Sequence, residues 1–356
     1  MSRQETVLVT GGSGYIGSWC VIALLQQGYT VRTTVRSLAR EAAVRAAIGT
    51  VVDPQDRLSF HAADLTSDAG WDAAARGCAY VLHVASPISI APPRNPDELI
   101  VPARDGTRRA VAAALRAGVK RVVLTSSVAA ASPGSRPPGG TRESATDETT
   151  WTDLDDPRVG AYARSKTLAE RAAWELIEAA SRASTGASTA TTTMATVNPS
   201  VVLGPVLSRD FSDSVQVVQR LLSGRMPGLP RLGFSFVDVR DVADLHIRAM
   251  TAPEAAGQRF IAAGDFAWFA EVAALLRAHL GNAARKVPTR RVPDAVLRLV
   301  ALFDRSVAGV VPRLGEKHMF LSAKAQKVLG WRPRPLEETV LDCARSLIEA
   351  ERSSAG

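Results

Sequence analysis

The sequence has few cysteines, and they follow no recognisable pattern. Its 356 residues include three, Cys20, Cys78 and Cys343, which lie far apart and form no Cys-x-x-Cys pair. Disulfide frameworks and zinc cages need several closely spaced cysteines. We therefore expect neither a disulfide scaffold nor a metal site, and a reducing, cytoplasmic setting.

No long apolar run and no pattern of an export leader is visible in this sequence. A membrane-spanning helix needs roughly 20 uninterrupted apolar residues, whereas the run from Ala110 to Leu115 is short and flanked by arginines. A strand pattern starts at Thr6, which leaves no room for a charged leader and an apolar signal core. We expect a soluble protein with no membrane partner.

No basic run is interleaved with aromatic residues, which is the pattern typical of nucleic-acid binding. The net charge is +8, but the arginines are dispersed among alanines, and aromatic residues make up only 5% of the chain. We expect no nucleic-acid partner, and we attribute part of the positive excess to an anionic cofactor.

Between residues 6 and 198, short β-branched runs alternate with longer helical patterns. The runs are apolar nearly throughout, as in parallel strands that helices cover on both faces; they lie at 6–10, 30–36, 58–62, 79–84, 120–126 and 191–197. This pattern predicts an α/β fold, with a Rossmann-type doubly wound parallel sheet over 1–198. We expect 199–356 to form a smaller substrate lobe, from which the segment 234–262 returns to the first domain.

Other segments are predicted from their content of glycine and proline and from the periodicity of their hydrophobic residues. The stretch 132–160 is rich in Pro, Gly, Ser and Thr, so it reads as a long surface loop, either a mobile insertion or a substrate-facing flap. A helix is predicted over 157–179 and a linker over 181–193. Further helical patterns lie near 268–280, 293–304 and 336–352.

A glycine loop follows the first predicted strand. Gly11, Gly14 and Gly17 form a G-x-x-G-x-x-G pattern and open a helix that runs to about Gln27. Glycines permit the tight turn and the approach of a pyrophosphate, while the helix N-terminus offers unpaired N–H groups to the anion. The pattern favours a dinucleotide site over an ordinary glycine-rich turn.

The second predicted strand ends in Arg36, where a protein that binds NAD usually has an acid for the ribose hydroxyls. An arginine can pair with a 2′-phosphate and stack on adenine. We therefore expect NADP(H) as the cofactor, with Arg40 as a second contact. The alternative is that Arg36 is a solvated surface arginine.

Tyr162 and Lys166 stand four residues apart on the predicted helix, so both project from one face. We expect the ammonium of Lys166 to lower the pKa of the Tyr162 phenol and make it a general acid/base. Ser126 and Ser127 end the fifth predicted strand, at the sheet edge where ligands of such folds bind. We choose Ser127 to polarise a substrate carbonyl; Ser126 is either a cofactor contact or a cap.

Taken together, these residues resemble the extended short-chain dehydrogenase/reductases of the NAD(P)-dependent epimerase/dehydratase superfamily, in the branch that includes dihydroflavonol 4-reductase and cinnamoyl-CoA reductase. The resemblance covers nearly the whole chain. The residues that carry it are Val9 to Trp19, Val31 to Arg36, Asp64 and Leu65, His83 to Pro87, Thr125 to Ser127, Tyr162 to Lys166, Asn198 to Pro205 and Val237 to Ala243.

The resemblance implies that Asp64 and Leu65 lie by the adenine, Val84 to Ser86 line the cofactor cleft, Lys166 meets the nicotinamide ribose, and Pro199 and Ser200 contact the nicotinamide side. The full set of predicted cofactor contacts is Gly11, Gly14, Tyr15, Ile16, Gly17, Arg36, Arg40, Asp64, Leu65, Val84, Ala85, Ser86, Ser126, Tyr162, Lys166, Pro199, Ser200 and Val202. The predicted substrate contacts are Pro87, Ser127, Ser132 and Tyr162. His83 is expected to be a core histidine without a catalytic role.

Two departures from the branch restrict the substrate. Ser132 stands where flavonoid reductases carry an asparagine, and the residues around Tyr162 lack the Asn-Trp-Tyr-Cys-Tyr signature of cinnamoyl-CoA reductases. We expect an NADPH-dependent reductase of aldehydes or ketones, as a monomer or homodimer. The rival hypotheses are a nucleotide-sugar epimerase or dehydratase, which retains its cofactor through the cycle, and a redox sensor that binds NADP without chemistry.

Overall fold

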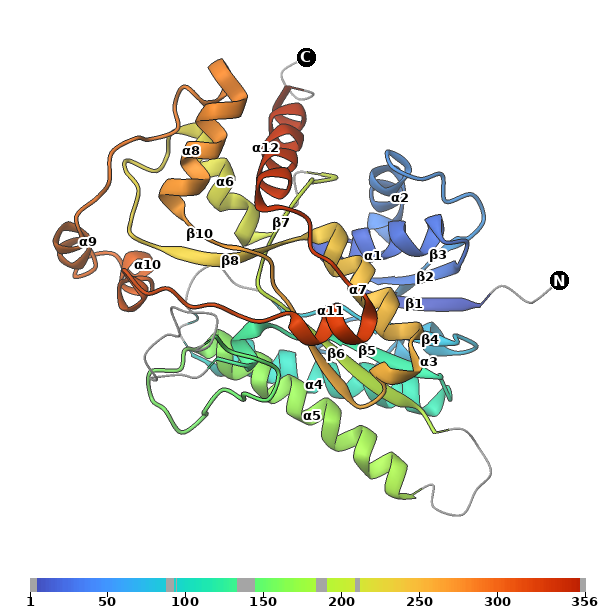
Figure 1. Cartoon of the computed structure of the whole chain (residues 1–356). Helices are drawn as coiled ribbons and strands as arrows, with labels where there is room; N and C mark the ends of the chain where they lie inside the picture. Colours follow the sequence, from blue (N-terminus) through green and yellow to red (C-terminus); the bar gives the residue numbers. More distant parts are fainter. Residues whose placement is uncertain are drawn as a thin grey trace.

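A seven-stranded parallel sheet forms the centre of the larger part of the molecule (Figure 1). The computed structural model describes residues 5–87, 93, 95–132, 145–183, 191–208 and 212–352. The sheet has the order β3-β2-β1-β4-β5-β6-β9, and its strands are β1 (Thr6–Thr10), β2 (Thr30–Val35), β3 (Leu58–Ala62), β4 (Tyr80–His83), β5 (Arg121–Thr125), β6 (Thr193–Pro199) and β9 (Gln258–Ala262). The predicted doubly wound fold is confirmed.

Helices bury both faces of this sheet, which explains why its strands are apolar throughout. On one face, Val7 and Val9 of β1 pack in a cluster with α1 (Tyr15–Gln26) and α7 (Val239–Thr251). On the other, Leu8 packs in a cluster with α3 (Trp71–Ala75), α4 (Asp97–Arg116) and α5 (Ala161–Ala183). All three β1 side chains are therefore almost fully buried, as expected of a strand in a parallel sheet.

A three-stranded sheet organises the smaller part, in the order β10-β8-β7. Its strands are β7 (Val201–Leu203), β8 (Gly233–Asp238) and β10 (Phe266–Trp268), and its helices are α6 (Asp213–Ser223), α8 (Phe269–Leu280) and α12 (Leu336–Arg352). The segment 234–262 is divided between the two sheets: β8 lies in the small sheet, whereas α7 packs on the large one and β9 extends it. The remaining helices are α2 (Glu41–Gly49), α9 (Asp294–Val300), α10 (Arg305–Ala308) and α11 (Ala323–Leu329).

Helix α5 begins and ends four residues later than the predicted range 157–179. The carboxylate of Asp156 accepts the N–H of Arg158, and the N–H of Val159 donates to the Asp156 carbonyl, so these residues form a turn. The guanidinium of Arg164 donates to three carbonyl groups of this turn and fixes the start of the helix. Tyr162 is consequently the second residue of α5.

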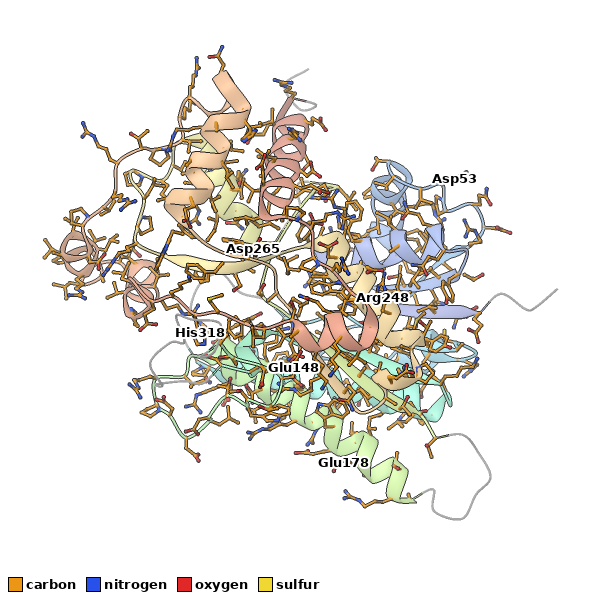
Figure 2. The ribbon with its side chains drawn as sticks, in the orientation of Figure 1. Asp53, Glu148, Glu178, Arg248, Asp265 and His318 are labelled. Carbon is orange, nitrogen blue, oxygen red and sulfur yellow. The ribbon has the colours of Figure 1, made fainter. Side chains whose placement is uncertain are left out.

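The described half of the long loop, residues 145–160, packs against the rest of the molecule. Thr146 forms backbone hydrogen bonds with Met319 and Leu321, and the Glu148 carboxylate accepts the N–H of Ile261 in β9 at 2.9 Å. Figure 2 places Glu148 near the centre of the molecule. This half is therefore not a loose insertion, while residues 133–144 of the predicted loop and 184–190 of the predicted linker lie outside the described residues.

Within the described ranges there is neither a membrane-spanning helix nor a cluster of metal ligands. No helix among them is both long and apolar enough to cross a bilayer, and no group of three or more His, Cys, Asp or Glu side chains within them could hold a metal ion.

Candidate active site

The glycine loop forms a close-fitting turn between β1 and α1. Gly11 has φ +71, and a Cβ atom there would lie 3.0 Å from the backbone of Ala85. A Cβ atom on Gly17 would lie 2.2 Å from the Gly11 carbonyl oxygen, so neither position admits a side chain. Gly14 caps α1 without a side-chain acceptor, which leaves the N–H groups of the first helical turn open to an anion.

A cavity of about 260 Å³ lies over this turn. Its lining combines the loop, α2 and the segment after β7, and consists of Gly12, Ser13, Gly14, Tyr15, Ser18, Arg40, Ala43, Val44, Ala47, Val206, Leu207 and Ser208. The structure thus brings Arg40 to the loop. The hydroxyl of Tyr15 donates to the Gly204 carbonyl at 2.7 Å, and Ile16 packs against the core, so both side chains mainly support the loop.

Charged residues follow the next two strands of the sheet. Arg36 comes directly after β2 and is exposed, and Asp64 follows β3. Hydrogen bonds from Thr66 hold the pKa of Asp64 below its ordinary value, and the nearby charges of Arg36 and Arg109 lower it further. The carbonyl of Leu65 accepts from Arg109 at 2.8 Å. Arg36 and Asp64 therefore lie close enough for their charges to interact.

The segment after β4 is tied to β1 by one hydroxyl group. The N–H groups of Val84 and Ala85 both donate to Thr10 Oγ1 at 3.0 Å, and that oxygen lies 2.8 Å from His83 Nδ1. Burial lowers the pKa of His83 to about 3, so the ring is neutral. His83 is a core residue as predicted, but its buried Nε2 has no hydrogen-bond partner among the described residues.

Ser127, Tyr162 and Lys166 come together at the carboxyl end of β5. Ser127 is buried, and its Oγ accepts the N–H of Ala129 at 3.1 Å and donates to the Tyr162 hydroxyl. Lys166 Nζ lies 5.9 Å from the centroid of the Tyr162 ring and donates to Ser86 Oγ at 2.9 Å. The structure therefore links the three residues to the segment after β4.

Desolvation sets the proton affinities of this group. Burial lowers the pKa of Lys166 to about 8, and the Glu170 carboxylate opposes the shift. Burial also raises the pKa of Tyr162, the Ser127 hydrogen bond lowers it, and the charge of Asp213 raises it. Although 41% of the Tyr162 surface is exposed, its hydroxyl end is desolvated. The expectation that Lys166 lowers the Tyr162 pKa is therefore wrong for this structure.

A buried ion pair lies beneath the site. Glu170, one helical turn after Lys166, is fully buried, and its Oε1 accepts from Arg259 Nε at 2.6 Å. Its Oε2 accepts from Ser126 Oγ at 2.6 Å and from Asn198 Nδ2 at 2.9 Å. Thr196 donates to Oε1 at 3.3 Å. The hydroxyl of Ser126 thus faces this network, and its predicted cofactor contact stays a prediction.

Arg259 extends this network to the described part of the long loop. Its guanidinium donates to the carbonyls of Glu148 and Thr150 at 2.8 Å and lies 3.8 Å from the centroid of the Trp151 ring. The Glu170–Arg259 pair therefore joins α5, β9, the loop and the ends of β5 and β6.

The remaining predicted contacts lie around the end of β6. Pro199 is buried at the last position of β6, and Val202 is buried in β7. Ser200 donates its N–H to the Ala262 carbonyl at 2.9 Å, and its buried Oγ has no hydrogen-bond partner among the described residues. Ser132 donates its N–H to Thr152 Oγ1 at 2.9 Å. Pro87 is half-buried just before residues 88–92, which the structure does not describe.

Sequence reasoning missed three charged residues of the site. Glu170 stands four residues after Lys166, but a glutamate at this spacing reads as half of an exposed helical ion pair. Its partner Arg259 lies 89 residues further along the chain. Asp213 is the first residue of α6, a helix of the smaller part of the molecule, and its charge raises the pKa of Tyr162. No local pattern marks the last two, because only the tertiary fold brings them to the site.

Fold and site together define a dinucleotide-binding α/β protein with a serine, a tyrosine and a lysine at the edge of its sheet. Residues 7–263 match the model of the NAD dependent epimerase/dehydratase family, and the chain belongs to this family. The predicted resemblance to the extended short-chain reductases is confirmed by its relatives.

Two curated relatives carry the names of the predicted branch. Cinnamoyl-CoA reductase 1 of Oryza sativa subsp. japonica is 37% identical over 277 residues, which cover 77% of this chain and 76% of the relative. Dihydroflavonol 4-reductase of Zea mays is 34% identical over 283 residues, with coverages of 78% and 74%. Among solved structures, yeast methylglyoxal/isovaleraldehyde reductase complexed with NADPH has a TM-score of 0.78 and 25% identity, covering 98% of this chain and 99% of that one.

Substitution of Glu170 tests the buried ion pair. Glu170→Ala leaves the Arg259 guanidinium buried without its carboxylate, so we expect a loss of about 3–5 kcal/mol in the free energy of unfolding. The matched control is Glu175→Ala on the same helix: Glu175 is exposed and pairs with Arg108 at 3.3 Å, so its loss is expected to cost under about 1 kcal/mol. Urea unfolding measures both, and equal losses would contradict the structural role of the pair.

Proposed function

We propose that this protein is an NADPH-dependent reductase that converts an aldehyde or ketone to an alcohol, reversibly. The observation that carries the proposal is the meeting of Ser127, Tyr162 and Lys166 at the edge of the sheet, beside the glycine loop. The names of the relatives support it, because they are reductases of carbonyl compounds, and the yeast structure holds NADPH.

The residues around the loop fit a dinucleotide. The cavity over the turn is lined by Gly12, Ser13 and Gly14, so a pyrophosphate could approach the backbone there. Arg36 and Arg40 supply positive charge for a 2′-phosphate. The unpaired Ser200 Oγ offers a hydrogen bond beyond the end of β6. These four features would hold NADPH along the carboxyl edge of the sheet.

Side chains of the protein would then supply the proton for the reduction. When bound, the cofactor supplies hydride for the carbonyl carbon. Tyr162 donates its phenolic proton to the carbonyl oxygen as that oxygen gains negative charge, and Ser127 donates a hydrogen bond to the same oxygen. Lys166, which donates to Ser86 at 2.9 Å, would hold the nicotinamide ribose of the cofactor beside the phenol.

We further propose a general aldehyde or ketone as substrate rather than a flavonoid or a CoA thioester. Ser132 replaces the asparagine of flavonoid reductases, and the sequence around Tyr162 lacks the cinnamoyl-CoA reductase signature. The acidic Asp213 lies near enough to influence Tyr162, so a strongly anionic substrate would be repelled. The buried, unpaired cysteines Cys20, Cys78 and Cys343 support a reducing, cytoplasmic compartment.

Replacement of the tyrosine tests the chemistry. Tyr162→Phe removes the proton donor, so we expect carbonyl reduction to slow by on the order of 10² to 10⁴ while NADPH binding is retained. A panel of aldehydes and ketones followed by NADPH absorbance measures the rate, and stoichiometric consumption of NADPH separates a reductase from an epimerase. Full turnover by the variant would refute the proposed role of Tyr162.

Replacement of Arg36 tests the cofactor preference. A charge-assisted hydrogen bond is worth about 1.5–3 kcal/mol, so Arg36→Asp is expected to weaken NADPH binding about ten- to hundredfold. NADH lacks the 2′-phosphate and serves as the internal control, since its affinity is expected to hold or improve. Fluorescence titration with both nucleotides measures the ratio; an unchanged preference would mean that Arg36 is only a surface residue.

The pH dependence of the reaction tests the environment of Tyr162. Reduction needs the protonated phenol, so its rate falls as the pH rises through the Tyr162 pKa. Because Asp213 helps to raise this pKa, Asp213→Asn is expected to move the alkaline limb of the kcat profile to lower pH. Asp53→Asn, at the far edge of the molecule in Figure 2, is the control and is expected to leave the limb in place.

A further inference from the structure

Large hydrophobic side chains are exposed together on one small part of the surface. Of the ten that are exposed in the described part of the chain, five lie between residues 296 and 303. The exposed fractions are 60% for Leu299, 74% for Leu302 and 86% for Phe303. We call α9 and the turn after it, residues 294–304, the α9 knob. Figure 1 shows α9 at the outer edge of the molecule.

The base of the α9 knob is fixed to the fold. Arg231 donates to the carboxylate of Asp294 at 2.6 Å, and the strand-like pairing of Leu229 with residues 290–292 holds the preceding chain. Leu297 packs against the main core. The exposed side chains therefore lie on the outer face of an anchored segment, not on a frayed end.

The chain on either side of the α9 knob is rich in positive charge. The exposed cations between residues 285 and 317 form no ion pair among the residues that the structure describes; they are Arg285, Lys286, Arg290, Arg291, Arg298, Arg313 and Lys317. Of the two acids in the α9 knob, Asp294 is paired with Arg231, and Asp304 accepts the N–H of Val307 at 3.4 Å. Exposed apolar side chains that share a segment with unpaired cations such as Arg290, Arg291 and Arg298 favour a partner that is both apolar and anionic.

We propose that the α9 knob docks on an anionic lipid surface, with Leu302 and Phe303 entering the headgroup boundary and the arginines meeting lipid phosphates and carboxylates. Lipid surfaces offer apolar chains directly beneath negative charge, which matches this arrangement. A second copy of the chain fits less well, because a two-fold contact would set the same cations against each other. The proposal goes beyond the reductase activity and does not depend on it.

The proposal revises the expectation of no membrane partner. That expectation weighed only helices that span a bilayer, and a surface contact needs none. Docking on a membrane surface would leave the active site unchanged, because the α9 knob contains none of the proposed catalytic residues.

Sedimentation of the full chain with vesicles tests the proposal. We expect binding to vesicles of phosphatidylcholine with phosphatidylserine, weak binding to phosphatidylcholine alone, and release by salt. The double variant Leu302→Ser/Phe303→Ser is expected to lose at least about tenfold in binding, and Arg290→Gln, Arg291→Gln and Arg298→Gln about fivefold each. Val51→Ser/Val328→Ser, at two other exposed positions, is the matched control and is expected to bind as before.

Three results would overturn the proposal. They are equal binding to both vesicle types, unchanged binding of the Leu302→Ser/Phe303→Ser variant, and a concentration-dependent dimer in sedimentation velocity that this variant dissolves. The last would assign the patch to a second copy. An unchanged unfolding transition and unchanged reductase turnover in solution would show that each variant is folded. If the protein proved to have no reductase activity, the same sedimentation assay would still test lipid binding.

Discussion

The buried pair of Glu170 and Arg259 is the interaction on which the rest of the site depends. A carboxylate taken out of water costs several kcal/mol unless its lone pairs are satisfied, and here Arg259, Ser126 and Asn198 all donate to Glu170. Arg259 lies in β9, Asn198 in β6 and Ser126 directly after β5, which are three neighbouring strands of the sheet. Because Lys166 lies one helical turn before Glu170, the contacts that fix Glu170 also fix the start of α5 over the sheet edge. The relative position of the serine, tyrosine and lysine is therefore set by the sheet itself.

Burial, more than neighbouring charge, decides where protons reside in this site. It raises the pKa of Tyr162 and lowers that of Lys166 to about 8, while Glu170 limits the second shift. A phenol that keeps its proton at neutral pH is suited to donate it, which is what carbonyl reduction requires. The same environment makes the reverse reaction, which needs the phenolate, harder to start at neutral pH. The surroundings of Tyr162 thus keep protonated the group that the proposed reduction uses as its proton donor.

Local patterns predicted the parts of the site that local geometry creates. The glycine loop, the strands and the convergence of Ser127 with Tyr162 follow from short motifs and from the rule that parallel strands end at one edge. The pairing of Glu170 with Arg259 could not be predicted, because it depends on β9 taking its place beside β6 after a long excursion. The direction of the Tyr162 shift was missed for a related reason: a sequence shows which charges are near along the chain, but not how deeply a hydroxyl is buried.

Only the folded structure shows which of the cations behind the net charge of +8 are paired and which are not. Arg259 is neutralised by Glu170, and Arg240 by Asp238 and Asp342 at 2.7 and 2.9 Å, so these cations add little to the outer field. Arg290, Arg291 and Arg298 form no ion pair among the described residues, and they belong to the same stretch of chain as the most exposed apolar side chains. Composition alone suggested an anionic cofactor as the reason for the excess. The unpaired cations near the α9 knob add a second location for part of this excess, remote from the glycine loop in sequence, where the proposed lipid contact would use it.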